Sequence, residues 1–310
     1  MSAKASRASF GEALVTLGAE FQNIVALDAD LSKSTKSEAF GKKYPERFFQ
    51  MGIQEANMIG AAAGLALTGK IPFLCSFACF LTGRFDIIRV SVGYSNANVR
   101  LVGTHSGIGI GEDGYSQMGL EDIACMRTLP NMAVLQPADD IETKAMMRYL
   151  IDHEGPVYLR LTRQDLPAVN KEGYKFQYGR MVELSAGKDA VIFATGGLVG
   201  SAVFAAQELA REGMSVGVIN VHTIKPIDTE TITKWCGRVK HIFTAEDHNI
   251  IGGLGGAVAE VMAGLGTTSK LTRIGVHDTY GESGTPEGLY IKHGLDGHGV
   301  ARTVKSTLKS

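Results

Sequence analysis

The sequence predicts an α/β fold made of two doubly wound units, each with a mainly parallel sheet covered by helices on both faces. Short runs rich in β-branched and aromatic residues alternate with helix-length segments through most of the 310 residues. The alternation lapses once, near the middle of the chain, and then resumes. A chain of this length is long for one α/β unit and sufficient for two, each of which can bury its own core.

Five apolar runs predict the strands of the first unit, at residues 23–27, 71–75, 99–103, 132–135 and 156–160. In open parallel sheets, ligands bind on the loops beyond the carboxyl ends of the strands. The residues that follow three of these strands are Asp28, Asp30, Phe77, Phe80 and the run 105–113. We therefore expect separate loops to converge at one edge of this sheet.

A segment without periodicity separates the two units. From about Leu166 to Lys188 the chain is rich in Pro, Gly, Lys, Tyr and Gln, and a connector of this length indicates a domain boundary. Beyond it we expect a strand at 190–194, a helix near 200–212, a strand at 216–221 and a terminal helix near 299–308. The predicted organisation is a first domain at 1–170, a linker at 171–188 and a second domain at 189–310.

Composition and charge exclude several classes of function. The net charge of −1, from 31 basic and 32 acidic residues, gives no overall basic field for nucleic acid. The four cysteines form no CxxC pair and have no matching His cluster, so they indicate neither a zinc site nor a disulfide framework. No apolar run approaches the roughly 20 residues needed to span a bilayer, and the first residues lack the apolar core of a signal peptide. We expect a soluble, cytoplasmic protein with no membrane partner.

Glu55 is the most informative residue of the first unit. It lies where a strand ends and a helix of small, apolar residues begins, so the surroundings of this helix are expected to be protein rather than water. A carboxylate in the first helical turn is favoured by the helix dipole, which makes a simple capping role one interpretation. Partial desolvation favours a second interpretation, a role in acid/base catalysis, because it makes a carboxyl better able to share a proton with a nitrogen partner.

The chain resembles the transketolase family of thiamine diphosphate enzymes. The similarity includes Gly111-Glu112-Asp113-Gly114 and covers nearly the whole chain in order, through residues 26–31, 75–80, 104–107, 111–122, 161–163, 223–228, 246–248 and 252–255. Each segment alone is weakly specific, whereas their order and spacing together are hard to obtain by chance. The resemblance implies a thiamine diphosphate pyrimidine-binding domain followed by a transketolase C-terminal-like domain.

The resemblance also implies how the cofactor is held. Thiamine catalysis requires a carboxyl that shares a proton with the pyrimidine ring, and the matching residue is Glu55. Phe77 and Phe80 match aromatic residues that stack on this ring, although ordinary core packing is the alternative for both. Asp30 matches a carboxylate near the thiazolium and the subunit interface, where the alternative is a plain strand-end Asp.

The resemblance places five residues around a sugar phosphate substrate. His105 would hydrogen-bond the donor near its carbonyl end while protons move, and Asp113 would receive the hydroxyl of the second carbon. Gln117, Arg163 and Ser34 would contact the phosphate. Many relatives have His at the position of Gln117, and because a neutral amide adds no charge, Arg163 and Ser34 would contribute more to anion recognition. A surface salt bridge is the alternative role for Arg163.

The sequence lacks one half of the cofactor site. Full-length members of the family hold Mg²⁺ and the diphosphate with a Gly-Asp-Gly motif and a downstream Asn, and this chain has neither. We therefore expect no metal site here and a separate N-terminal, diphosphate-binding subunit in an α2β2 assembly. Activity of this chain alone is expected to be nil.

Several functions remain open at this point. The first is the C-terminal subunit of a split transketolase, which transfers a two-carbon unit from a ketose phosphate to an aldose phosphate. The second is the beta subunit of a 2-oxo acid dehydrogenase, which the run Ser116-Gln117-Met118 does not favour. A transketolase of a specialised sugar pathway, a deoxyxylulose phosphate synthase and a non-catalytic assembly partner are further alternatives. Intact Glu55, His105 and Asp113 argue against the last.

Overall fold

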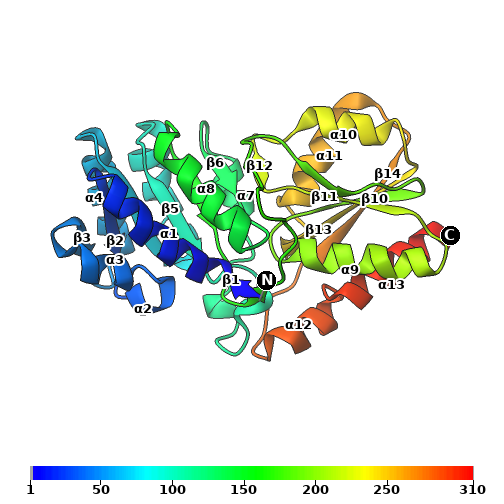
Figure 1. Cartoon of the computed structure of the whole chain (residues 1–310), viewed down its shortest axis with the longest axis horizontal. Helices are drawn as coiled ribbons and strands as arrows, with labels where there is room; N and C mark the ends of the chain where they lie inside the picture. Colours follow the sequence, from blue (N-terminus) through cyan, green and yellow to red (C-terminus); the bar gives the residue numbers. More distant parts are fainter. Residues whose placement is uncertain (1–2, 310) are drawn as a thin grey trace.

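Two α/β lobes, each built around its own sheet, lie side by side in the computed structural model, which describes residues 3–309 (Figure 1). The two sheets have seven and five strands, and a short two-stranded ribbon pairs β1 (Lys4–Ala5) with β8 (Asp165–Leu166). No helix in the described range is long and apolar enough to cross a membrane. This arrangement confirms the predicted α/β class.

The first sheet has the order β12-β6-β7-β5-β4-β2-β3. Its strands are β2 (Ile24–Asp28), β3 (Phe48–Gln50), β4 (Ile71–Phe77), β5 (Arg100–Thr104), β6 (Ala133–Leu135), β7 (Val157–Arg160) and β12 (Thr223–Lys225). Every neighbouring pair is parallel except β12 with β6. Parallel strands with both faces covered are apolar on both faces, and β2 and β4 are buried along their whole length.

Helices cover both faces of the first sheet. One face packs against α1 (Ser6–Glu20), α3 (Glu38–Lys43) and α8 (Asp140–Asp152). The other packs against α4 (Glu55–Leu67), α5 (Ala78–Thr82), α7 (Asp122–Arg127) and the π-helix η2 (Ile88–Tyr94). Short turns complete this lobe, namely α2 (Ser32–Thr35), η1 (Pro45–Arg47), α6 (Phe85–Ile87), η3 (Ile108–Ile110) and η4 (Tyr115–Gln117).

The second sheet has the order β14-β13-β10-β11-β9. It consists of β9 (Val182–Ser185), β10 (Ala190–Ala194), β11 (Val216–Asn220), β13 (His241–Asn249) and β14 (Lys270–Val276). One face packs against α9 (Leu198–Arg211), α12 (Pro286–His293) and α13 (Gly297–Lys309), and the other packs against α10 (Thr229–Cys236) and α11 (Leu254–Leu265). Figure 1 shows α9 and α10 on opposite sides of this sheet.

Two short strands differ from the predicted organisation. β9 lies inside the segment expected to be an aperiodic linker, and it forms the edge of the second sheet, where it pairs antiparallel with β11. β12 lies in the range expected for the second domain, yet it pairs antiparallel with β6 of the first sheet. Runs of three or four residues at a sheet edge carry little periodicity, so the sequence pattern missed both. The domain limits 1–170, 171–188 and 189–310 stay a prediction.

Candidate active site

Five parallel strands of the first sheet end at one edge, where most of the residues expected to be functional lie. β2, β3, β4, β5 and β7 all run in the same direction. The residues at or just beyond their carboxyl ends are Asp30, Glu55, Phe77, His105 and Arg163. Phe77 is the last residue of β4 rather than a loop residue, so its ring is fixed by the sheet itself. The parallel topology therefore places the loops after these strands at one edge of the sheet, as expected.

Glu55 is the first residue of α4 and is buried, with only 6% of its surface exposed. Its Oε1 atom accepts a hydrogen bond of 3.1 Å from Ser76 Oγ, a residue of β4 that is itself fully buried. No ion pair in residues 3–309 involves Glu55. A buried carboxyl with a hydroxyl partner and no neutralising cation is suited to share a proton with a bound nitrogen group. The sequence pattern did not identify Ser76, since it is one of several small residues in an apolar strand.

Three rings stack beside this carboxyl-bearing helix end. The ring centroids of Phe77 and His105 are 3.7 Å apart at an interplanar angle of 25°. Phe77 also stacks on Phe80, with centroids 5.4 Å apart and planes only 9° from parallel. Phe77 is 7% exposed and Phe80 is half-buried, so the stack is a wall between core and surface. Aromatic faces of this kind can hold another flat ring in an offset arrangement.

The contacts of His105 define its tautomer. Its Nε2 atom lies 2.9 Å from Arg7 Nη1, and a guanidinium can only donate, so Nε2 is the acceptor. The Nδ1 atom then carries the hydrogen and donates to Thr104 Oγ1 at 2.8 Å. Burial, together with the positive charges of Arg7, Arg163 and Lys36, lowers the pKa of His105 to about 3. His105 is therefore a neutral imidazole at physiological pH.

Three cationic side chains surround His105. Arg7 is half-buried, and burial together with the charge of Arg163 lowers the pKa of its guanidinium. Its Nη1 atom also donates to the carbonyl oxygen of Ser34 at 2.8 Å. Arg163 Nη1 donates to the carbonyl of Ile110 at 2.5 Å. A cluster of Arg7, Lys36 and Arg163 at the end of a sheet is an electrostatic site for an anionic group such as a phosphate.

Arg7 reaches this cluster through pairing that is distant in sequence. β1 pairs with β8, which places Ala5 opposite Asp165 and sets the start of α1 beside the loop that carries Arg163. Ser6 Oγ accepts a hydrogen bond of 2.8 Å from the backbone N–H of Thr162, which reinforces this contact. The local sequence pattern does not indicate Arg7 as a site residue, because nothing in residues 4–7 points to a partner 160 residues away. The only local indication was that Arg7 is a basic residue in the first turn of a helix. A positive charge there is unfavourable because of the helix dipole, unless the residue has another role.

Buried Asp28 organises the loop that carries Ser34. Its carboxylate accepts hydrogen bonds from the backbone of Leu31 at 2.6 Å, from Thr35 Oγ1 at 2.8 Å and from Ser37 Oγ at 2.9 Å. Burial nevertheless raises the pKa of Asp28. These contacts fix the short helix α2, so that the Ser34 carbonyl meets Arg7 and Lys36 comes near His105.

The remaining candidate residues are less closely tied to this cluster. Asp113 is about half-exposed, and its carboxylate lies 3.6 Å from Arg163 Nη1, while Glu112 lies 3.7 Å from the same atom. Asp30 is exposed, and its backbone has a positive φ of 64°. Gln117 ends η4 and is half-buried. In the described part of the chain, neither Asp30 nor Gln117 has a side-chain hydrogen bond or ion pair with the cationic cluster.

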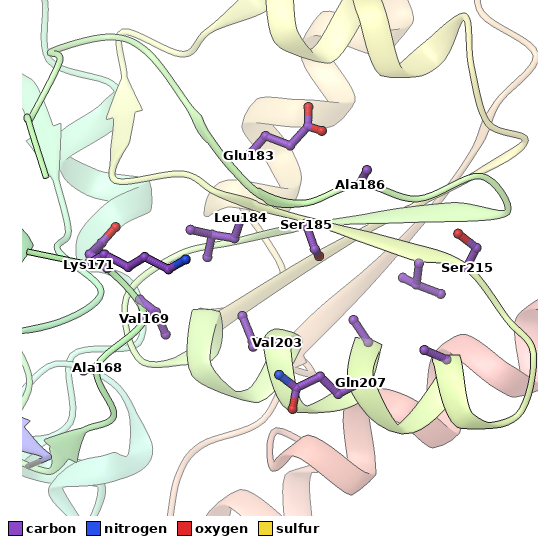
Figure 2. A pocket seen from close by; sticks show the side chains of 14 residues that line it. Ala168, Val169, Lys171, Glu183, Leu184, Ser185, Ala186, Val203, Gln207 and Ser215 are labelled. Carbon is purple, nitrogen blue, oxygen red and sulfur yellow. The ribbon is translucent and has the colours of Figure 1, made fainter. Parts of the chain in front are cut away.

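A separate cavity lies in the second lobe and is not part of this edge. It has a volume of about 610 Å³ and lies between α9, β9 and residues 168–171 (Figure 2). Figure 2 shows Val203 and Gln207 of α9 along one side and Leu184 and Ser185 of β9 along the other. None of the candidate residues lines it. Residues 3–309 also contain no group of three or more His, Cys, Asp or Glu side chains placed to hold a metal ion.

Family models account for almost the entire chain. The model described as "Transketolase, pyrimidine binding domain" matches residues 2–169, and "Transketolase, C-terminal domain" matches residues 179–300. A Methanocaldococcus jannaschii protein named as a transketolase C-terminal section is 47% identical over 99% of this chain and 97% of its own length. The 6-deoxy-6-sulfo-D-fructose transketolase subunit SqwH of a Clostridium species is 39% identical over 96% of this chain and 92% of its own.

Solved structures and longer relatives agree with these matches. A structure titled "Split gene transketolase, inactive beta4 tetramer" has a TM-score of 0.91 and 44% identity, and the match covers 98% of both chains. The transketolase of Homo sapiens is 35% identical over 98% of this chain, which corresponds to 49% of the human protein. This chain thus corresponds to nearly the full length of the split proteins and to about half of the single-chain one.

Proposed function

This chain belongs to the transketolase family, and we propose that it is the subunit of a split transketolase that carries the pyrimidine-binding and C-terminal domains. The proposed reaction transfers a two-carbon ketol unit from a ketose phosphate to an aldose phosphate. The observation that carries the proposal is the buried Glu55 at the start of α4, bonded by Ser76. The stacked rings of Phe77 and Phe80 lie on the neighbouring strand β4 and the helix α5 that follows it.

These residues fit the pyrimidine half of thiamine diphosphate. Glu55 would share a proton at its carboxyl with a ring nitrogen, and Ser76 would orient that carboxyl. Phe77 and Phe80 offer aromatic faces for the flat ring, while Asp30 is proposed to lie near the thiazolium. When bound, the cofactor supplies the carbon nucleophile of two-carbon transfer.

The cationic cluster fits the anionic end of the substrate. Arg7, Arg163 and Lys36 are proposed to bind the phosphate, with Ser34 and Gln117 as neutral hydrogen-bonding partners. His105 is neutral, so near the carbonyl end of the donor its Nε2 atom is proposed to accept a proton or a hydrogen bond once Arg7 turns to the phosphate. The carboxylate of Asp113 is proposed to accept a hydrogen bond from the second-carbon hydroxyl of the substrate, and Arg163 would hold this carboxylate in place.

A separate N-terminal subunit is proposed to hold the diphosphate and Mg²⁺. The described part of this chain has no cluster placed for a metal ion, and the chain matches only half of a single-chain transketolase. The similar split-gene structure is a β4 tetramer described as inactive, which supports the need for a partner. We propose an α2β2 assembly, in which each site lies between the two kinds of subunit.

Two relatives suggest a class of sugar donors. Their names include 6-deoxy-6-sulfo-D-fructose and apulose 4-phosphate, which both carry an anionic group at one end of the sugar. A cluster of three cations would accept either a phosphate or a sulfonate. The donor is therefore proposed to be a ketose with a terminal anion, from central metabolism or from a specialised sugar pathway.

The proposed location is the cytoplasm. All four cysteines are free thiols, including Cys75 in the buried strand β4. Free thiols persist in a reducing compartment. Fractionation of cells that express the tagged chain checks this.

Reconstitution tests the proposed function. The chain is mixed with its candidate N-terminal subunit, thiamine diphosphate and Mg²⁺, and two-carbon transfer from xylulose 5-phosphate to ribose 5-phosphate is assayed, with each subunit alone as a control. Activity in the mixture only is the expected result. If the mixture binds the cofactor but transfers nothing from any anionic ketose, the substrate class is wrong and 2-oxo acid decarboxylation becomes the better candidate.

A further inference from the structure

We infer that Asp247, a residue of the C-terminal domain, is a positioning residue that fixes the substrate loop, defined here as residues 105–114. This inference rests on the proposed function, because it assumes that two residues near the ends of this loop, His105 and Asp113, contact the substrate. Asp247 itself would not touch the substrate. It would act through the backbone between these two side chains.

The substrate loop has a backbone that needs external support. His105 has a positive φ of 57°, a conformation that is sparsely populated for residues other than glycine. Gly107, Gly111 and Gly114 also have positive φ, at 80°, 83° and 76°. Glycine adopts such a conformation at no steric cost, whereas at His105 it persists only where the surrounding structure determines it.

The Asp247 carboxylate supplies this support from the other lobe. Its Oδ1 atom accepts a hydrogen bond of 2.8 Å from the backbone N–H of Ile108, and Oδ2 accepts a longer one of 3.4 Å from Gly109. These are the first two residues of η3, so the carboxylate caps a turn that belongs to a different sheet. A Cβ atom on Gly107 would lie 2.0 Å from Asp247 Oδ2, so the loop approaches the carboxylate as closely as glycine permits.

Asp247 is itself held rigidly. It is 1% exposed and lies near the end of β13, a strand with neighbours on both sides. Tyr290 of α12 donates a hydrogen bond of 2.7 Å to its Oδ2 atom, and Arg160 Nη2 donates one of 2.9 Å to its carbonyl oxygen. A side chain with this many fixed partners is suited to define the position of a neighbouring segment.

The same network reaches the cationic cluster. Gln164, which directly follows Arg163, donates to the hydroxyl of Tyr290 at 2.8 Å. Arg163 in turn donates to the carbonyl of Ile110, the last residue of η3. Asp247 and Tyr290 therefore lie behind both the substrate loop and the residue proposed to bind the phosphate. This gives the C-terminal domain a direct role in the shape of the site.

The test uses Asp247→Asn in the reconstituted enzyme. The Asn side chain has the same size, but its NH₂ group can only donate. It would face one of the two backbone N–H groups, of Ile108 or Gly109, so one of the two hydrogen bonds to the loop is lost. We expect kcat/KM for the ketose donor to fall on the order of 10- to 100-fold, as for a displacement of about 1 Å in a positioned group. Cofactor affinity should stay within about twofold of wild type, because Glu55, Phe77 and Phe80, the residues proposed to hold the pyrimidine, lie outside the substrate loop.

Asp228→Asn is the matched control. Asp228 is also buried and also accepts hydrogen bonds from two backbone N–H groups, those of Met181 and Thr231, and from one hydroxyl, that of Thr231. It caps α10 in the same domain and does not contact the substrate loop. A similar loss of activity in Asp228→Asn and Asp247→Asn would overturn the inference. Both losses would then be explained by a general loss of protein stability rather than by a change in the substrate loop.

Hydrogen–deuterium exchange on the chain alone separates this inference from the proposed function. Asp247→Asn should speed exchange at the amides of Ile108 and Gly109, and Asp228→Asn should not. If the wild-type mixture transfers no two-carbon unit, the proposed function fails, while exchange still decides whether Asp247 fixes the loop. Unchanged exchange at these amides, or faster exchange with unchanged kcat/KM, would overturn the positioning role. Tyr290→Phe, which removes only a hydroxyl, provides the same comparison if Asp247→Asn does not fold.

Discussion

Arg7 Nη1 lies 2.9 Å from His105 Nε2, although the two residues are 98 positions apart in the chain. This contact brings the start of the first helix into the proposed substrate site. It also decides which nitrogen of His105 carries the hydrogen, because a guanidinium cannot accept one. The state of His105 is therefore set by a residue that the sequence motifs do not contain.

His105 should remain neutral throughout the physiological range. Burial and three nearby cations lower its pKa to about 3, against 6.5 for a free imidazole. Since the unfolded chain takes up this proton below about pH 6.5 and the folded chain does so only near pH 3, this group makes the fold less stable as the pH falls between these values. NMR of the imidazole nitrogens, assigned with His105→Asn, should show one neutral tautomer from pH 5 to 8. A titration centred near pH 6.5 would contradict this.

Arg7→Gln should weaken binding of the sugar phosphate. Loss of a hydrogen bond to a charged group costs about 1.5–3 kcal/mol, so KM for a phosphorylated ketose should rise about 10- to 100-fold in the reconstituted enzyme. Arg211→Gln, at the exposed end of α9, is the control and should leave KM unchanged. Equal KM values in wild type and Arg7→Gln would exclude Arg7 from the phosphate site.

Arg160→Met should destabilise the chain strongly. Arg160 and Asp122 form a fully buried ion pair of 2.7 Å, and removal of the cation leaves a buried carboxylate without its partner. The expected loss is about 3–5 kcal/mol in the free energy of unfolding, measured by urea denaturation. Arg148→Met, which breaks an exposed pair of 3.4 Å with Asp152, should cost less than about 1 kcal/mol. A similar cost for both variants would show that burial of the Arg160 pair is not decisive.

The sequence predicted the features of the site that have a local signal. Alternating apolar runs gave the strands, and the small apolar residues after Glu55 gave the helix at whose first turn this carboxyl is buried. The remaining features depend on pairing between distant segments. Arg7 enters the site through the β1–β8 ribbon, and Asp247 meets the substrate loop from the other lobe. Neither contact leaves a periodic pattern, so neither was predictable from the order of residues.

The edge strands show the same limit in the fold. β12 has three residues and pairs antiparallel with β6, so it joins the first sheet from a position far along the chain. Its partner is decided by which edge is open in the folded protein rather than by its own sequence. Short strands at sheet edges are therefore the elements that a sequence pattern assigns least well.

The central claim is that this chain supplies the acid/base half of a thiamine diphosphate site that another subunit completes. The most direct test is two-carbon transfer by wild-type and Glu55→Gln chains, each mixed with the N-terminal subunit, with calorimetry of cofactor binding alongside. We expect activity only in mixtures, and a loss of at least about 100-fold in the Glu55→Gln mixture while the cofactor still binds. Near-normal turnover by Glu55→Gln, or by the wild-type chain alone, would contradict it.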